Sequence, residues 1–148
     1  MKAFNLIFGA ILVCISLSSC AIDSNDESFE CDRKVVISAE EYIIAPNDQL
    51  TINSLEINGD CLTINFSSSG CSGDSWELKL IDADVILESY PPKRNLRLSL
   101  KNEELCDAFI TREIIFDIYK LQVDRNQVFG KKVKLNITNS DDQILYKY

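Results

Sequence analysis

The chain has 148 residues, of which 15 are basic, 23 are acidic and none is histidine, so its formal net charge at pH 7 is −8. This acidic balance argues against binding to nucleic acid or to anionic lipid, because both require basic patches. A chain of this length, with 46% hydrophobic residues, predicts a single domain that is large enough to bury its own core.

Residues 1–19 have the pattern of a secretory signal peptide. Lys2 provides the positive start, and the run from Ala3 to Leu17 is apolar apart from Asn5 and Ser16. This run of about fifteen residues is shorter than the roughly 20 that span a bilayer as a helix. We therefore expect the segment to be removed by cleavage.

The end of the apolar run carries a more specific pattern. Small residues lead into Cys20 in Leu17-Ser18-Ser19-Cys20, and this stretch resembles the bacterial lipoprotein signal. The resemblance implies that the Cys20 thiol is acylated, that Cys20 becomes the new N-terminus and that it carries three acyl chains. Two or more chains anchor a protein stably to a membrane. Ala21 stands where an aspartate would hold a lipoprotein at the inner membrane, so the resemblance favours the outer membrane.

Residues 20–33 are expected to form the lipidated cysteine and an acidic tether. The tract Asp23-Ser24-Asn25-Asp26-Glu27 cannot bury enough area to order itself, which predicts a flexible segment. It also resembles the surface-export signal of Bacteroidota lipoproteins. The periplasmic face and the cell-surface face of the outer membrane both stay open.

Four cysteines remain once the signal peptide and Cys20 are set aside: Cys31, Cys61, Cys71 and Cys106. An even number in an oxidising compartment predicts disulfides, for which three pairings are possible. We favour Cys31–Cys61 and Cys71–Cys106, because each bond then joins one loop or strand end to another. Each would contribute about 2–4 kcal/mol. The spacings contain no C-x-x-C, so neither a zinc site nor thiol exchange is predicted.

The clearest local structure is a hairpin within Leu50–Phe66. Asn58-Gly59-Asp60 lies between two runs of alternating apolar residues, which is a strong hairpin pattern. A register that puts the apolar residues on one face pairs Ile57 with Leu62 and Leu55 with Ile64; a slip by one residue would turn them outward. The loop is then either Gly59-Asp60 or the four residues from Asn58 to Cys61.

Alternation of apolar and polar residues predicts further strands along the chain. These are expected at Lys34–Ser38, Trp76–Ile81, Val85–Tyr90, Leu96–Leu100, Ile110–Ile118, Val133–Ile137 and Ile144–Tyr148. The segments between them are expected to include a loop at Ser67–Ser75, a break at Asp82–Asp84, a strand end at Pro91-Pro92 and one helical turn at Glu103–Ala108.

These elements predict one all-β domain over residues 34–148. Seven to nine short strands, separated by turn residues and without a long helix, are typical of a single antiparallel β-sandwich of the immunoglobulin-like class. A partly closed barrel is the alternative. Trp76 is in phase with Leu78 and Leu80, so we expect it in the core.

No catalytic residues are predicted. Without histidine, the usual general base and most nucleophile triads are missing. Several carboxylate pairs lie at expected turns, and we interpret them as solvated caps rather than as a glycosidase dyad. These pairs are Asp82 and Asp84, Glu103 and Glu104, and Asp141 and Asp142. No cofactor and no metal site is predicted.

Two segments are candidate recognition loops, because binding residues concentrate in loops on a rigid scaffold. The first contains Ser69, Gly70, Ser72, Gly73 and Asp74, and the second contains Tyr90, Pro91 and Pro92.

Several short motifs resemble those of small, uncharacterised outer-membrane or surface lipoproteins of Bacteroidota. The residues that carry the resemblance are Gly59-Asp60-Cys61-Leu62-Thr63-Ile64, Ser69-Gly70-Cys71, Tyr90-Pro91-Pro92, Leu96–Leu100, Cys106-Asp107-Ala108 and Ile110-Thr111. In that pattern the Gly-Cys loop and the Cys-Asp-Ala turn recur together, which implies the Cys71–Cys106 bond. The motifs are structural, and the resemblance implies no enzymatic activity.

Two functions are compatible with this sequence. The first is a non-catalytic binding or accessory module of the cell envelope, bound to the membrane through the lipid on Cys20 and contacting an unknown envelope protein or glycan. The alternative is a hydrolase inhibitor or a small hydrolase at the cell surface.

The lipid anchor leads to a direct prediction. We expect mass spectrometry of the processed protein to find Cys20 acylated and at the N-terminus. An unmodified N-terminus at another residue would refute the anchor.

Overall fold

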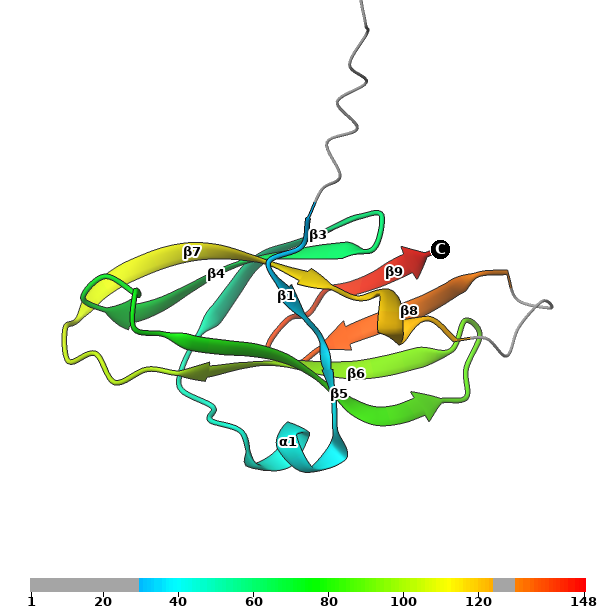
Figure 1. The fold of residues 1–148 in the computed structure, drawn as a ribbon, viewed down its shortest axis with the longest axis horizontal. Coiled ribbons are helices and arrows are strands. Elements are labelled where there is room, and N and C mark those ends of the chain that lie inside the picture. The colour runs from blue at the N-terminus through cyan, green and yellow to red at the C-terminus, as the bar shows by residue number, and fades with distance from the viewer. Residues whose placement is uncertain (1–29, 124–129) are drawn as a thin grey trace, which may run out of the picture.

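A computed structural model describes residues 30–123 and 130–148 (Figure 1). The expected signal peptide, Cys20 and the acidic tract lie outside the described residues. The strands are β1 (Arg33–Lys34), β2 (Val36–Ile37), β3 (Thr51–Asn58), β4 (Cys61–Gly70), β5 (Glu77–Leu87), β6 (Lys93–Lys101), β7 (Ala108–Asp117), β8 (Lys132–Ile137) and β9 (Gln143–Lys147). The helices are α1 (Ala39–Ile44) and the short 3-10 helix η1 (Tyr119–Leu121).

The strands form two sheets, in the orders β1-β7-β4-β3 and β2-β5-β6-β8-β9. The all-β class is confirmed, and the described strands do not close into a barrel. The expectation of purely antiparallel pairing is wrong, because β1 pairs with β7, β2 with β5 and β6 with β8 in parallel. Alternation indicates which face of a strand is buried, but it carries no information about a strand's neighbour or direction.

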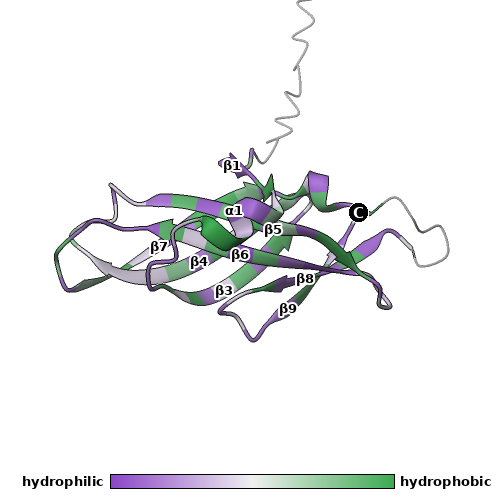
Figure 2. Ribbon diagram, turned by 90° about the horizontal axis from the view of Figure 1, so that it is seen from below, coloured by the Kyte–Doolittle hydropathy of each residue, from purple (hydrophilic) through white to green (hydrophobic). Residues whose placement is uncertain are grey.

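One hydrophobic core lies between the two sheets. Alternate residues of the long strands point into it, and Figure 2 shows the strands changing repeatedly between hydrophilic and hydrophobic colours along their length. The buried residues include Leu62, Ile64 and Phe66 of β4, Leu96, Leu98 and Leu100 of β6, and Ile114 and Phe116 of β7. Trp76 is 6% exposed and packs on Phe66, which confirms its expected place in the core.

The predicted hairpin is confirmed together with its register. Ile57 lies opposite Leu62 and Leu55 opposite Ile64. Asn58 pairs with Cys61, so the loop is the two-residue form, Gly59-Asp60, with Gly59 at φ +58°. Asp60 is held at this turn, because its carbonyl accepts a hydrogen bond from the Ile118 N–H at 2.8 Å and its carboxylate accepts one from the buried Tyr146 hydroxyl.

Three local expectations are wrong. Ser67–Gly70 belongs to β4, because β7 pairs with all four of these turn-forming residues and β3 pairs with Ser67. Asp82–Asp84 forms a bulge inside the continuous strand β5, with Asp84 at φ +56°. Glu103–Ala108 is not helical, and the Glu104 side chain in it bonds to backbone N–H groups of the β4–β5 connection.

Helix α1 is not predicted by the sequence patterns, since a helix of six residues has little stability by itself. Ser38 caps its start by accepting a hydrogen bond from the Glu41 N–H. Arg97 of β6 caps its end, because the guanidinium donates hydrogen bonds to the carbonyls of Glu41, Tyr42, Ala45 and Pro46. This buried cation from another element therefore satisfies the carbonyl groups that a helix end leaves without partners.

Described residues ahead of residue 34 already contact the domain. Cys31 is bonded to Cys61, Asp32 accepts a hydrogen bond from the Ile115 N–H at 3.0 Å, and Arg33 donates one to the Leu78 carbonyl at 2.7 Å. β1 then lies at the edge of one sheet and β2 at the edge of the other, with Val35 buried between them.

The bulge in β5 places a charged pair in the interior. Asp82 is fully buried, and its Oδ1 atom accepts hydrogen bonds from Arg94 and from the Asp84 N–H, each at 2.8 Å. Burial raises the pKa of Asp82, although the Arg94 charge opposes this shift. Asp82 thus differs from the solvated turn carboxylate expected from the sequence.

Removal of Arg94 is expected to destabilise the fold strongly. The substitution Arg94→Met leaves the Asp82 carboxylate buried without its partner, which should lower the free energy of unfolding by about 3–5 kcal/mol. The measurement is chemical denaturation with the disulfides intact. The matched control is Lys79→Met, which breaks the exposed Lys79–Glu41 pair and should cost no more than about 1 kcal/mol. Equal losses in the two variants would contradict the role assigned to the buried pair.

Candidate functional site

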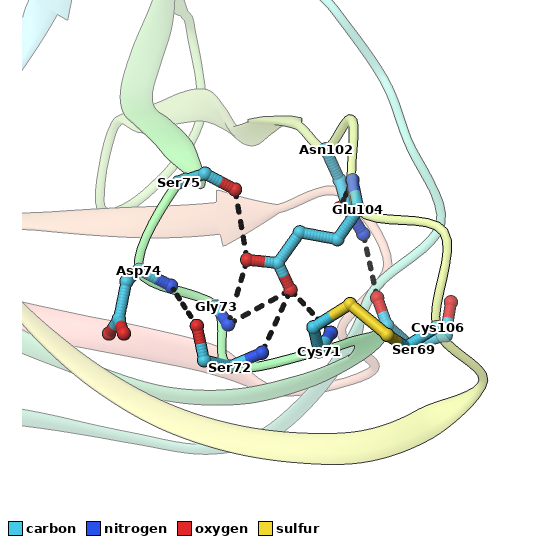
Figure 3. Close-up of a disulfide and its surroundings, with 9 residues drawn as sticks. All are labelled: Ser69, Cys71, Ser72, Gly73, Asp74, Ser75, Asn102, Glu104 and Cys106. Carbon is cyan, nitrogen blue, oxygen red and sulfur yellow. Dashed lines mark hydrogen bonds between the residues drawn. A yellow bond between two sulfur atoms is a disulfide. The ribbon is translucent and has the colours of Figure 1, made fainter.

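An exposed region held by a disulfide and several side-chain hydrogen bonds lies where two connections meet at one end of the molecule (Figure 1). We call it the stapled end and define it as residues 71–76, between β4 and β5, together with residues 102–107, between β6 and β7. The Cys71–Cys106 disulfide joins the two connections, with the Cα atoms 4.8 Å apart (Figure 3). This bond and Cys31–Cys61 are the two pairings that the sequence favoured.

The carboxylate of Glu104 organises the first connection. Oε2 accepts hydrogen bonds from the N–H groups of Cys71, Ser72 and Gly73 at 2.5, 3.0 and 3.0 Å, and Oε1 accepts one from the Ser75 hydroxyl at 2.9 Å. Figure 3 shows these donors pointing at one side chain. Successive N–H groups aimed at one point form an anion-binding nest, and in this protein the anion is part of the chain.

These contacts alter the acidity of Glu104. The Gly73 N–H lowers the pKa most, and the Ser75, Ser72 and Cys71 donors add to it against some desolvation, so that the pKa falls from 4.5 to about 2. The side chain is therefore ionised at neutral pH. A charged acceptor makes stronger hydrogen bonds than a neutral one, so ionisation and loop order reinforce each other.

Asn102 fixes the position of Glu104. Its Oδ1 atom accepts a hydrogen bond from the Glu104 N–H at 2.9 Å, and its Nδ2 atom donates one to the Ser69 carbonyl at 2.7 Å. Gly70 leaves room for this packing, since a Cβ atom there would lie 2.5 Å from Glu104 Oε2 and 2.9 Å from the Trp76 ring. The connection between β6 and β7 is thus tied to β4 by side-chain bonds as well as by the disulfide.

Arg112 of β7 holds the other side of the loop. Its guanidinium donates hydrogen bonds to the Ser72 carbonyl at 2.6 Å and to the Asp74 carboxylate at 2.5 Å. A cleft of about 320 Å³ lies beside this pair and is lined in part by Arg33, Trp76 and Glu113. The loop is therefore supported from both sides.

The stapled end presents an apolar side chain within an acidic segment. Leu105 is 96% exposed, although residues on both sides of it are fixed by the Glu104 bonds and by the disulfide. Glu103 and Asp107 are exposed on the same segment. An exposed leucine on a fixed backbone can enter a partner's pocket with little loss of conformational entropy.

The predicted recognition residues lie in two separate places. Ser72, Gly73 and Asp74 belong to the stapled end, and Ser69 and Gly70 form the adjoining end of β4. The second predicted segment, Tyr90-Pro91-Pro92, lies beyond the far end of the eleven-residue strand β5, with Lys132 packed over the Tyr90 ring. The structure does not bring the two segments together.

Sequence reasoning missed the part played by Asn102 and Glu104. The expectation that Glu104 is half of a solvated turn pair is wrong, because its carboxylate accepts hydrogen bonds from the loop N–H groups. Two features of the sequence could have indicated this arrangement. A carboxylate, Glu104, lies two residues before Cys106, and the Ser69–Ser75 stretch contains two glycines, a composition suited to an anion nest.

The described residues contain no cluster of three or more His, Cys, Asp or Glu side chains that could hold a metal ion. No helix among residues 30–123 and 130–148 is both long and apolar enough to cross a membrane. The chemistry that the stapled end offers is recognition through shape, an exposed leucine and negative charge.

No protein-family model matches the sequence, and no curated protein matches it. The fold is similar to that of a NigD-like immunity protein from Bacteroides caccae, with a TM-score of 0.57 and 11% identity over 77% of this chain and 58% of that one. It is also similar to a protein of unknown function, DUF1344, from Bacteroides vulgatus, with a TM-score of 0.51 and 16% identity over 78% of this chain and 56% of that one.

The chain spans less than two thirds of the length of either structure. At these identities the similarity concerns the fold alone. Both sources are Bacteroides species, which is consistent with the resemblance to uncharacterised Bacteroidota proteins.

The nest makes the stability of the fold depend on pH. Because the folded state holds the pKa of Glu104 at about 2, below its ordinary value of 4.5, its stabilising contribution is complete above pH 4.5 and is lost as pH falls toward 2. We expect Glu104→Gln to be less stable than wild type at pH 7 and to lose less stability between pH 4.5 and 2. Urea denaturation across this pH range measures both effects.

The matched control is Glu103→Gln, which removes a neighbouring charge without touching the N–H groups of the loop. A similar loss of stability at pH 7 in both variants would contradict the role of the nest.

Proposed function

We propose that this chain is a non-catalytic binding module of the bacterial cell envelope, anchored to the outer membrane through Cys20, and that its stapled end binds a protein partner. The observation that carries the proposal is the exposure of Leu105 on a segment held by a disulfide and by the Glu104 nest. We also propose that the two sheets are an immunoglobulin-like sandwich, which their shared core supports.

The charges at the stapled end indicate the kind of partner. The exposed Glu103 and Asp107 lie within two residues of Leu105 in the sequence, while the nearby Lys101 is already paired with Glu77 and Glu103. A partner with a basic surface around an apolar pocket fits this arrangement. Such charges accelerate association and select the partner more than they strengthen binding.

The anchor would set where the partner is found. Ten residues, Ala21 to Glu30, separate Cys20 from Cys31, and they reach at most about 35 Å when fully extended. The partner of this module would therefore be a membrane protein or a protein held close to the membrane, on the periplasmic or the cell-surface face.

A second candidate function is inhibition of an envelope or secreted hydrolase. A rigid exposed loop suits an inhibitor, and one structure of similar fold is a NigD-like immunity protein. In this role the stapled end would occupy the partner's active site. The small-hydrolase alternative has less support, because Asp82 and Glu104 are both engaged in structural contacts.

Site-specific crosslinking tests the proposal in native membranes. A photo-reactive residue at position 105 of the full chain should give a discrete crosslinked protein, and the same residue at the partly exposed Leu145 of β9 should not. With the crosslinked protein purified, Leu105→Ala should weaken binding about 30-fold, as expected for a central contact worth roughly 2 kcal/mol.

Two results would overturn the binding role. One is the same crosslinking pattern from positions 105 and 145, and the other is equal affinity of wild type and Leu105→Ala. If the partner is a hydrolase, inhibition of its rate by wild type but not by Leu105→Ala identifies the second function.

A further inference from the structure

Beside the stapled end, two open hollows adjoin each other. One has a volume of about 420 Å³ and the other about 220 Å³, and both are lined by Gln49, Leu50 and Thr51. The larger extends to Asn139 in the β8–β9 turn, and the smaller extends to Ser69 and Phe109 at the paired ends of β4 and β7. The two hollows share the segment 49–51, and they are treated together as one surface. We call it the polar groove.

The lining of the polar groove is almost free of charge, although 26% of the chain is charged. Amide and hydroxyl groups predominate, and among the described residues Asp48 is the single ionisable side chain that lines either hollow. Its carboxylate already accepts a hydrogen bond from the Asn102 N–H at 2.7 Å. The side chains of Gln49, Thr51 and Ser69 are exposed and make no hydrogen bond within the described part of the chain.

The backbone that presents these groups is held in place. The Ser68 hydroxyl donates a hydrogen bond to the Gln49 carbonyl at 2.6 Å, and the Asp48 N–H donates one to the Leu100 carbonyl at 3.0 Å. The buried Ser67 hydroxyl bonds to Thr111 and to Asn53, each at 2.8 Å. The groove therefore has fixed walls and donor and acceptor groups that are not in use, which is the arrangement of a preformed binding site.

An aromatic ring stands at one end of the polar groove. Phe109 lies opposite Ser69 in the β4–β7 ladder and is 72% exposed. Its ring offers an apolar face next to hydroxyl and amide groups. A sugar ring needs this combination, because its C–H face packs on an aromatic ring while its hydroxyls both donate and accept hydrogen bonds.

We propose that the polar groove binds a neutral oligosaccharide chain. Amides and hydroxyls supply the paired donors and acceptors that polyols require, and Phe109 supplies a stacking platform for one ring. The Asp48 carboxylate and the acidic balance of the chain disfavour uronic acids, sulfated sugars and nucleotides. This site goes beyond the proposed function, since it uses none of the contacts assigned to Leu105.

Isothermal titration calorimetry with the full chain in detergent tests the proposal. The ligands are neutral hexasaccharides of glucose, xylose and mannose, hexagalacturonate as the anionic comparison, and an uncharged Gly-Ser hexapeptide. We expect at least one neutral sugar to bind and hexagalacturonate and the peptide not to bind. Phe109→Ala should weaken the sugar about tenfold, equivalent to roughly 1.4 kcal/mol, because the stacking contact is lost. Gln49→Ala should weaken it as well.

The matched control is Leu105→Ala, which changes an exposed apolar side chain of the neighbouring stapled end. It should leave sugar binding unchanged while weakening binding of the protein partner about 30-fold, so the two proposals can fail separately. The polar groove proposal is overturned if no neutral hexasaccharide binds, if Phe109→Ala binds as tightly as wild type, or if hexagalacturonate or the peptide binds more tightly than every neutral sugar.

Discussion

The structure depends on the burial of β4 between two neighbouring strands and over one core. β4 pairs with β3 on one side and with β7 on the other, and Leu62, Ile64 and Phe66 on its inner face are fully buried. The two disulfides begin at its two ends, since Cys61 is its first residue and Cys71 directly follows its last. β4 therefore connects two features of the fold. The N-terminal segment is bonded to its first residue, and the stapled end directly follows its last residue.

Under the proposed function, this placement separates the point of membrane attachment from the recognition surface. The described chain begins at the Cys61 end of β4, as Figure 1 shows, while the stapled end follows Gly70. A strand of ten residues is about 33 Å long. A lipid anchor preceding Cys31 would thus hold one end of the domain near the membrane and leave the stapled end and the adjoining polar groove accessible to a partner and a glycan.

Two charged side chains, one buried and one bound by a loop, hold the connecting segments in place. Arg97 satisfies carbonyl groups at the end of α1, and Glu104 satisfies N–H groups in the β4–β5 loop. In both cases a side chain of one connection or strand completes the backbone hydrogen bonds of another, because a short helix or a tight loop leaves such groups without partners. The function proposed for the stapled end relies on this order, since a mobile loop would lose entropy on binding.

Sequence patterns were sufficient for features that arise from near neighbours. The Ile57–Leu62 register, the place of Trp76 in the core and most strands followed from alternation and turn chemistry, which act over a few residues. Parallel pairing, helix α1 and the Glu104 nest required the tertiary structure. Glu104 bonds to residues 29–33 positions away, and Arg97 bonds to carbonyls 51–56 positions away. The sequence by itself determined which apolar residues of most strands face inward, whereas only the folded chain decided which distant polar groups meet, because that depends on the order of strands in each sheet.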